Sequence, residues 1–344
     1  MARTLVLSKN TRREVGAFQS SKSARRYWIV LCSMLLAAGL FTAGLLAWDN
    51  PMEFGSRGFW LIAERRLDAV IAMAIVALCQ AMATVSFQTV TNNRIITPSI
   101  MGFESLYTVI HTSTVFFFGA SGLINARNLE MFVLQIVLMV GLSLLLYAWL
   151  LTGKNSNMHA MLLIGIIIGA GLGSVSTFMQ RMLTPSEFDV LTARMFGSVN
   201  NADASYYPVA IPLIAVAVVV LYLNSRRLNV LALGRDAAIN LGVNYKFHAI
   251  GTLIMVSILM AVSTALVGPM TFLGFLVATL AYQFAETYDH RFIFPMAALI
   301  GFVVLTGAYF IMNHIFYAQG VVSIIIEMVG GIVFLVVVLR KGRL

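Results

Sequence analysis

The sequence predicts an all-α protein, a polytopic transmembrane helical bundle of about ten spans. Of the 344 residues, 60% are hydrophobic and only 11% are charged, whereas soluble domains carry about 25% charged residues. The mean hydropathy is +0.88. The apolar residues form long runs separated by mostly short polar segments, and about 20 consecutive apolar residues suffice to cross a bilayer as a helix.

Ten such runs follow one another along the chain. A basic tail, residues 1–26, precedes the first run, which is too long to be the apolar part of a signal peptide. The third run contains Glu104 and His111, and the eighth begins just after Pro269. Residues 27–340 are expected to form a single transmembrane domain. The predicted spans are 27–48, 67–90, 98–119, 131–152, 158–180, 206–224, 248–267, 270–285, 292–313 and 321–339.

The distribution of Lys and Arg predicts the orientation of the bundle. If the N-terminus is cytoplasmic, 17 of the 23 Lys and Arg residues fall on the cytoplasmic side and 6 fall outside. Because positive residues favour cytoplasmic loops, this bias predicts that both termini are cytoplasmic. The charges sit in short loops and at the chain ends rather than in one patch, so we expect a lipid bilayer and no nucleic acid as partner.

Motifs for catalysis and for metal binding are missing from the sequence. Gly153-Lys154 lacks the first Gly and the Ser/Thr of a phosphate-binding Walker A loop. The five His residues show no ligand spacing on one helix face, and Cys32 and Cys79 lie in apolar segments. We therefore expect no enzymatic activity, no metal site and no cofactor in this chain.

The connection at residues 225–247 is unusually apolar for a loop. Gly234 and Gly242 bracket a short helical segment, Arg235–Leu241, in which Ala237, Ala238 and Leu241 share one face. Such a face needs a partner, which is either the lipid surface or the groove of another protein. The residues alone leave both alternatives open.

Polar side chains also occur inside the predicted spans. In the fifth span, Gly165, Gly169 and Gly173 favour close helix packing. Polar residues that continue this span, and Glu327 within the last one, either pack against neighbouring helices or line a polar path. Glu104 lies near the start of the third span and is expected to reach the cytoplasmic interface.

Several motifs resemble, in the same order, those of the iron-chelate and vitamin B12 importer permeases. Leu231–Val243 resembles the cytoplasmic coupling loop of that family, and Gly268–Gly274 and Asp289-His290-Arg291 resemble two further motifs. Arg66-Leu67 and the spacing of Gln88, Asn93, Pro98 and Gly102 are also similar. Arg94 departs from the family, which has Pro after the Asn. The resemblance covers residues 27–340 and implies the type II fold of ATP-binding cassette (ABC) importers.

The resemblance implies a permease subunit of an ATP-driven importer in the bacterial inner membrane. The subgroup that it points to imports ferric siderophores of the catecholate type. The implied partners are a second homologous permease in a heterodimer, two cytoplasmic ABC ATPase subunits that hydrolyse ATP, and a periplasmic ferric-siderophore-binding protein. A haem or vitamin B12 importer permease is an alternative. An ion-driven secondary transporter is a further one, which the scarcity of carboxylates in the spans disfavours.

The resemblance also implies roles for individual residues. Arg66 would dock the binding protein on the outer face. The ATPase-coupling loop would comprise Leu233, Gly234, Arg235, Asp236, Ala237, Ala238, Leu241 and Gly242. The candidates for the translocation path are Ser174, Thr177, Gln180 and Glu327.

Overall fold

The structure of the chain is a computed structural model that describes residues 16–125, 127–152, 158–316 and 322–341. Helices make up the fold, and the described residues include no strand beyond a single bridge between Phe18 and Thr287. Residues 1–15 of the predicted basic tail lie outside the described residues. The α-helices are α1 (Ser21–Ala47), α2 (Arg57–Val90), α3 (Phe103–Asn125), α4 (Leu129–Thr152), α5 (Met158–Gln180), α6 (Pro185–Met195), α7 (Tyr207–Leu223), α8 (Ser225–Leu231), α9 (Arg235–Asn240), α10 (Tyr245–Val267), α11 (Leu273–Ala285), α12 (His290–His314) and α13 (Val322–Lys341), with short 3-10 turns at Pro98–Met101, Val199–Asn201 and Ala204–Tyr206.

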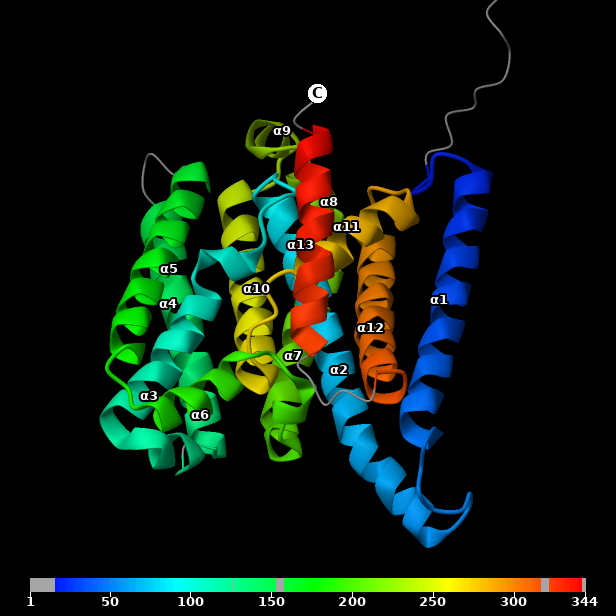
Figure 1. The fold of residues 1–344 in the computed structure, drawn as a ribbon. Coiled ribbons are helices and arrows are strands. Elements are labelled where there is room, and N and C mark those ends of the chain that lie inside the picture. The colour runs from blue at the N-terminus through cyan, green and yellow to red at the C-terminus, as the bar shows by residue number, and fades with distance from the viewer. Residues whose placement is uncertain (1–15, 126, 153–157, 317–321, 342–344) are drawn as a thin grey trace, which may run out of the picture.

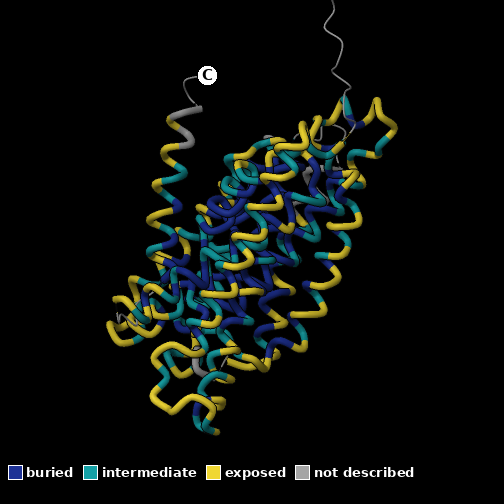
Figure 2. The backbone as a smooth tube through the Cα atoms, turned by 90° about the vertical axis from the view of Figure 1, so that its right-hand side faces the viewer, coloured by how far each residue is buried: buried dark blue, intermediate teal, exposed yellow. Residues whose placement is uncertain are grey.

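Helices α2 and α10 form the centre of the bundle. They pack along each other, with α12 against α2, α4 against α10 and α1 at the edge (Figure 1). In the most apolar stretch of each helix, 83% of the residues of α2 and 72% of those of α10 are buried, against 11% for α1. Figure 2 shows the buried residues gathered in the middle of the bundle. The exposed side of α1 is apolar, which suits a helix that faces lipid.

Each of the ten predicted spans contains an α-helix. Among the described residues, six helices are long and apolar enough to cross a membrane, namely α1, α2, α5, α7, α10 and α12, while α4, α11 and α13 hold shorter apolar segments. Helix α3 is interrupted at Gly119, where φ is 70°. The start of α1 and the end of α13 lie at the same end of the bundle as α9, which we call the α9 end (Figure 1). This agrees with an even number of spans, although the count of ten stays a prediction.

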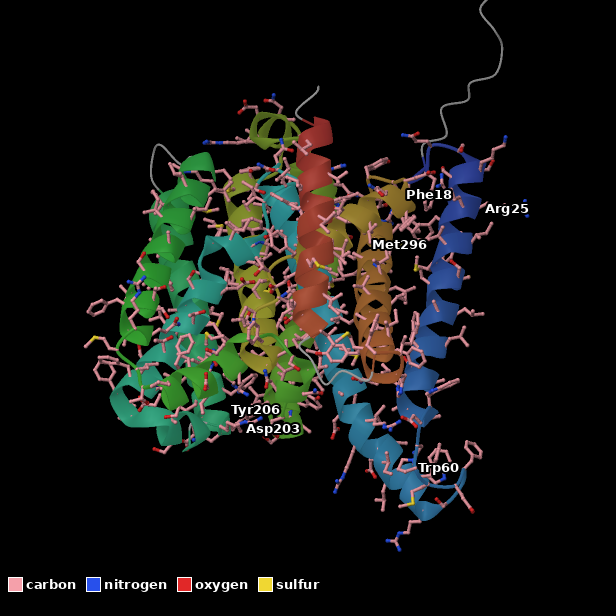
Figure 3. All side chains as sticks on the ribbon, viewed as in Figure 1. Phe18, Arg25, Trp60, Asp203, Tyr206 and Met296 are labelled. Carbon is pink, nitrogen blue, oxygen red and sulfur yellow. The ribbon has the colours of Figure 1, made fainter. Side chains whose placement is uncertain are left out.

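The clearest differences from the predicted ranges concern α2 and α6. Helix α2 begins at Arg57 rather than at residue 67, and the Ser56 hydroxyl caps it by accepting a 3.2 Å hydrogen bond from the Phe59 N–H. The prediction followed the apolar run, but charged residues are also good helix formers and extend the helix past that run. This extension carries Trp60 beyond the other helices (Figure 3). Helix α6 lies in a segment predicted as a loop.

Candidate functional site

Helix α9 lies at the end of the bundle between two glycines. Gly234 has a φ of +93° and Gly242 a φ of +78°, a region of backbone conformation that residues with a side chain rarely adopt. The Ala238 N–H donates to the Gly234 carbonyl at 3.0 Å, and the Gly242 N–H donates to the Ile239 carbonyl at 2.9 Å. The short helix predicted between these glycines is therefore confirmed.

The outward side of this segment is apolar. Leu233, Ile239 and Leu241 are 62%, 52% and 61% exposed, and we call these three residues the coupling surface. The prediction that Ala238 faces outward together with Ala237 and Leu241 is wrong, because Ala238 is fully buried. Helix α9 packs against α8 and α10. These exposed apolar side chains lie outside the predicted membrane spans, which makes them candidates for contact with a partner.

Helix α8 anchors α9 to the bundle. Its residues Leu228 and Leu231 are buried. Between them, the Asn229 side chain accepts a hydrogen bond from the His290 backbone N–H at 3.0 Å and contacts the His290 Nδ1 atom at 2.6 Å. Its amide donates to Asp289 Oδ1 at 3.1 Å. The other His290 ring nitrogen lies 2.7 Å from the Thr89 hydroxyl. These contacts join α8 to the start of α12 and to the end of α2.

The Asp289 carboxylate completes this network at the start of α12. It accepts hydrogen bonds from the Arg291 side chain at 2.9 Å and 2.5 Å. Burial pushes the pKa of Asp289 up, but the hydrogen bonds from Arg291 more than offset it and hold the pKa below its ordinary value. The carboxylate is therefore ionised at neutral pH, and the acceptor that Asn229 needs is present.

Replacing Asn229 with leucine is expected to lower the free energy of unfolding by about 2 kcal/mol, because it leaves the buried backbone N–H and ring Nδ1 of His290 without their partner and removes one donor from Asp289. The measurement is the melting temperature of the purified protein in detergent. The control is Asn240→Leu, since Asn240 is exposed on α9. Equal melting temperatures for the two variants would contradict the role of Asn229.

The predicted path residues of α5 do not all face the same way. Ser174 and Thr177 line an open groove of about 480 Å³, and their hydroxyls donate to the Ala170 and Gly173 carbonyls of their own helix, both at 2.9 Å. Gln180 instead points into the bundle, where its amide donates to the Thr112 hydroxyl on α3 at 3.2 Å. The groove is thus lined by two of the three path candidates on α5.

Glu327 belongs to a cluster that the sequence did not reveal. Its half-buried side chain on α13 lies close to the Thr271 backbone. The Thr271 hydroxyl donates to Glu104 Oε2 at 2.6 Å. The other Glu104 oxygen is buried and has no hydrogen-bonding partner within the described ranges. Glu104 thus bonds inside the protein rather than reaching the interface, and Thr271 lies near carboxylates from α3 and α13. The sequence signal that could have pointed to this cluster is a carboxylate within an apolar run, which occurs at both Glu104 and Glu327.

The two sets of path candidates do not converge within this chain. Helices α5 and α13 have different neighbours, since α5 packs against α3 and α4 and α13 packs against α11 and α12. Each keeps one exposed face, on which Ser174 and Thr177 lie for α5 and Met328 and Ile332 for α13. One chain therefore supplies two separate walls rather than a closed path.

Arg66 lies near the other end of the bundle and holds the end of α1. Its guanidinium donates to the Trp48 carbonyl at 2.8 Å, to the Asp49 carbonyl at 3.2 Å and to the Leu45 carbonyl at 3.3 Å. A cation at this place satisfies the free carbonyls of a helix C-terminus. The docking role of Arg66 stays a prediction, and the structure assigns it a capping role as well.

The chain resembles known transport proteins along nearly its whole length. It is 57% identical to the petrobactin import system permease protein FatC of Bacillus anthracis over 97% of this chain and 95% of that protein. It is 25% identical to the petrobactin import system permease protein FatD of the same organism, over 95% of each chain. A solved metal-chelate type ABC transporter in an inward-facing conformation has the same fold, with a TM-score of 0.77 and 20% identity over 91% of this chain and 99% of that one.

A comparison with protein families agrees with these relatives. Residues 28–340 match the FecCD transport family, and this range includes the coupling surface and both walls of path candidates. The predicted resemblance to importer permeases over residues 27–340 is thereby confirmed. This chain belongs to the FecCD transport family.

Proposed function

We propose that this chain is the permease subunit of an ATP-driven importer of a ferric siderophore of the catecholate type, in the cytoplasmic (inner) membrane. The observation that carries the proposal is the 57% identity to a petrobactin import permease over 97% of the chain. Because the identity extends over the whole bundle, it includes the surfaces that a permease uses toward its partners as well as the helices that face the cargo.

The geometry supports an assembly of several chains. The exposed apolar side chains of the coupling surface offer a cytoplasmic ATPase a place to bind, one ATPase on each permease. The separate walls on α5 and α13 favour a second, homologous permease that supplies the facing walls. A ferric-siderophore-binding protein would dock at the end of the bundle opposite the α9 end, where Arg66 lies.

Coupling follows from the way α9 is anchored. Closure of the ATPases around ATP would push on the coupling surface. Helix α8 would carry that displacement to α2 and α12, because Asn229 bonds to the start of α12 and His290 bonds to Thr89. Since α2 lies at the centre of the bundle, its displacement would change which end of the path is open.

The test is uptake by a strain that lacks this chain. We expect uptake of radiolabelled ferric petrobactin to be lost and to return with the wild-type gene, while uptake of haem and of vitamin B12 is unchanged. Loss of haem or vitamin B12 uptake with normal petrobactin uptake would favour the alternative cargo. Uptake that collapses with an uncoupler while cellular ATP is maintained would favour an ion-driven transporter.

A further inference from the structure

A polar cavity of about 370 Å³ opens beside α9. It lies where α2 ends, where α8 leads into α9 and where α11 leads into α12. The volume falls in the range of pockets that bind ligands or inserted side chains. The lining residues that matter here are Gln88, Thr89, Asn92, Arg94, Tyr282 and His290.

Several side chains that line this cavity are polar and buried. Gln88, Thr89 and His290 are 2%, 7% and 3% exposed, so the side chains that line the cavity are otherwise buried. The Gln88 amide donates to the Arg94 carbonyl at 2.8 Å, which fixes the Arg94 backbone against α2. The Gln88 Oε1 atom is buried and has no hydrogen-bonding partner within the described ranges. A buried acceptor of this kind is costly unless a donor reaches it.

Arg94 supplies a positive charge to the cavity. Its guanidinium lies over the Tyr282 ring, 4.5 Å from the centroid. The ion pairs found in the described part of the chain use Arg26 and Arg291, and none of them involves Arg94. Membrane orientation alone would explain a positive charge in this loop. It would not explain why the charge borders a cavity lined by buried amide and imidazole groups.

We propose that this cavity, the Arg94 pocket, receives an acidic side chain of the cytoplasmic ATPase and forms a second anchor beside the coupling surface. The proposal rests on the proposed function, in which an ATPase covers α9. Ala232 lines the pocket, and a Cβ atom at Gly234 would lie 3.9 Å from the Asn92 amide. A partner seated on the coupling surface therefore also covers the pocket.

The charge of the pocket and its position beside the coupling surface favour an acidic side chain of the partner that covers α9. A carboxylate matches the unpaired guanidinium of Arg94, whose planar donors suit that group. A loop of a protein partner can place such a carboxylate at Arg94 while the rest of the partner covers the mouth of the cavity. An Asp or Glu on a loop of the ATPase would pair with Arg94.

The experiment measures the affinity of the ATPase for the purified permease pair in nanodiscs at low salt. Arg94→Ala is expected to raise Kd about tenfold, and Arg94→Lys, which keeps the charge but lacks the planar donors, is expected to recover part of that loss. Arg25→Ala is the matched control, since Arg25 is exposed at the same end and points away from the bundle (Figure 3). An unchanged Kd for Arg94→Ala would overturn the proposal.

A third variant separates this proposal from the proposed function. Leu241→Asp alters the coupling surface and leaves the pocket intact. If Leu241→Asp does not weaken ATPase binding, the proposed function fails and the pocket proposal fails with it. If Leu241→Asp weakens binding and Arg94→Ala does not, only the pocket proposal fails. A melting temperature that citrate or phosphate raises in the wild type but not in Arg94→Ala, with ATPase affinity unchanged, would assign the pocket to a free anion and overturn the proposal.

Discussion

Replacing Leu241 with aspartate is expected to abolish siderophore uptake while the bundle stays folded. Leu241 is 61% exposed and lies outside the buried core, so the folded chain loses little when it is replaced. In the complex, the substitution removes an apolar contact that contributes about 1.5–3 kcal/mol when fully buried and places a charge in a desolvated surface. ATPase affinity should therefore fall about 100-fold or more.

The measurement is uptake and ATP hydrolysis by the complete importer in proteoliposomes. Asn240→Asp is the matched control, because it adds the same charge one residue away without removing an apolar side chain. We expect the control to keep most of its uptake. Normal uptake by a well-inserted Leu241→Asp variant would show that the coupling surface does not bind the ATPase. Ala238→Arg cannot serve this purpose, since the burial of Ala238 makes it a test of folding.

The substitution is made at Leu241 rather than at Ala238 because Leu241 is exposed and Ala238 is buried. The presence of α9 could be predicted, because the glycines that bracket it are local signals. Its orientation could not, because the side that is buried depends on contacts with α8 and α10. For a helix of fewer than two turns, the sequence pattern defines the faces but does not say which one meets its own chain.

The helices themselves were predictable because their signals, like the glycines that bracket α9, are local. An apolar run long enough to cross a bilayer is a local property, and every predicted run contains a helix. The cluster around Thr271 was not predictable, since Thr271 and Glu104 are separated by 167 positions along the chain. The capping contacts of Arg66 were not predictable either, because its carbonyl partners belong to the end of another helix.

Replacing Gly197 with alanine is expected to have the largest effect on folding. A Cβ atom at Gly197 would lie 2.2 Å from the Pro269 carbonyl oxygen, a backbone atom that cannot move aside alone. Gly268, on the other connection, has a φ of +93°, and a Cβ atom there would lie 3.2 Å from the Gly197 Cα atom, so the two backbones are in contact. Here the connection after α6 crosses the connection between α10 and α11, and two glycines allow the backbones to touch.

The cost of this substitution combines overpacking and lost hydrogen bonds. Separating the two connections would break the bond from the Ser198 N–H to the Val267 carbonyl, which is 2.8 Å long, and would strain the bond from the Val199 N–H to the Tyr309 hydroxyl. Overpacking costs about 1–3 kcal/mol and each lost bond about 1 kcal/mol. We therefore expect a loss of about 3 kcal/mol or more, read as a lower melting temperature and a lower yield in the membrane.

Gly171→Ala is the control for this variant, because a Cβ atom at Gly171 meets no atom within 4 Å and alanine favours the helix. Its melting temperature should be unchanged or higher, and an equal value for Gly197→Ala would refute the close contact. The effect should extend to the translocation path, since Thr271 follows Pro269 by two positions. A shift of this connection would pull Thr271 away from Glu104 and Glu327, so any Gly197→Ala protein that reaches the membrane should import less siderophore than its amount predicts.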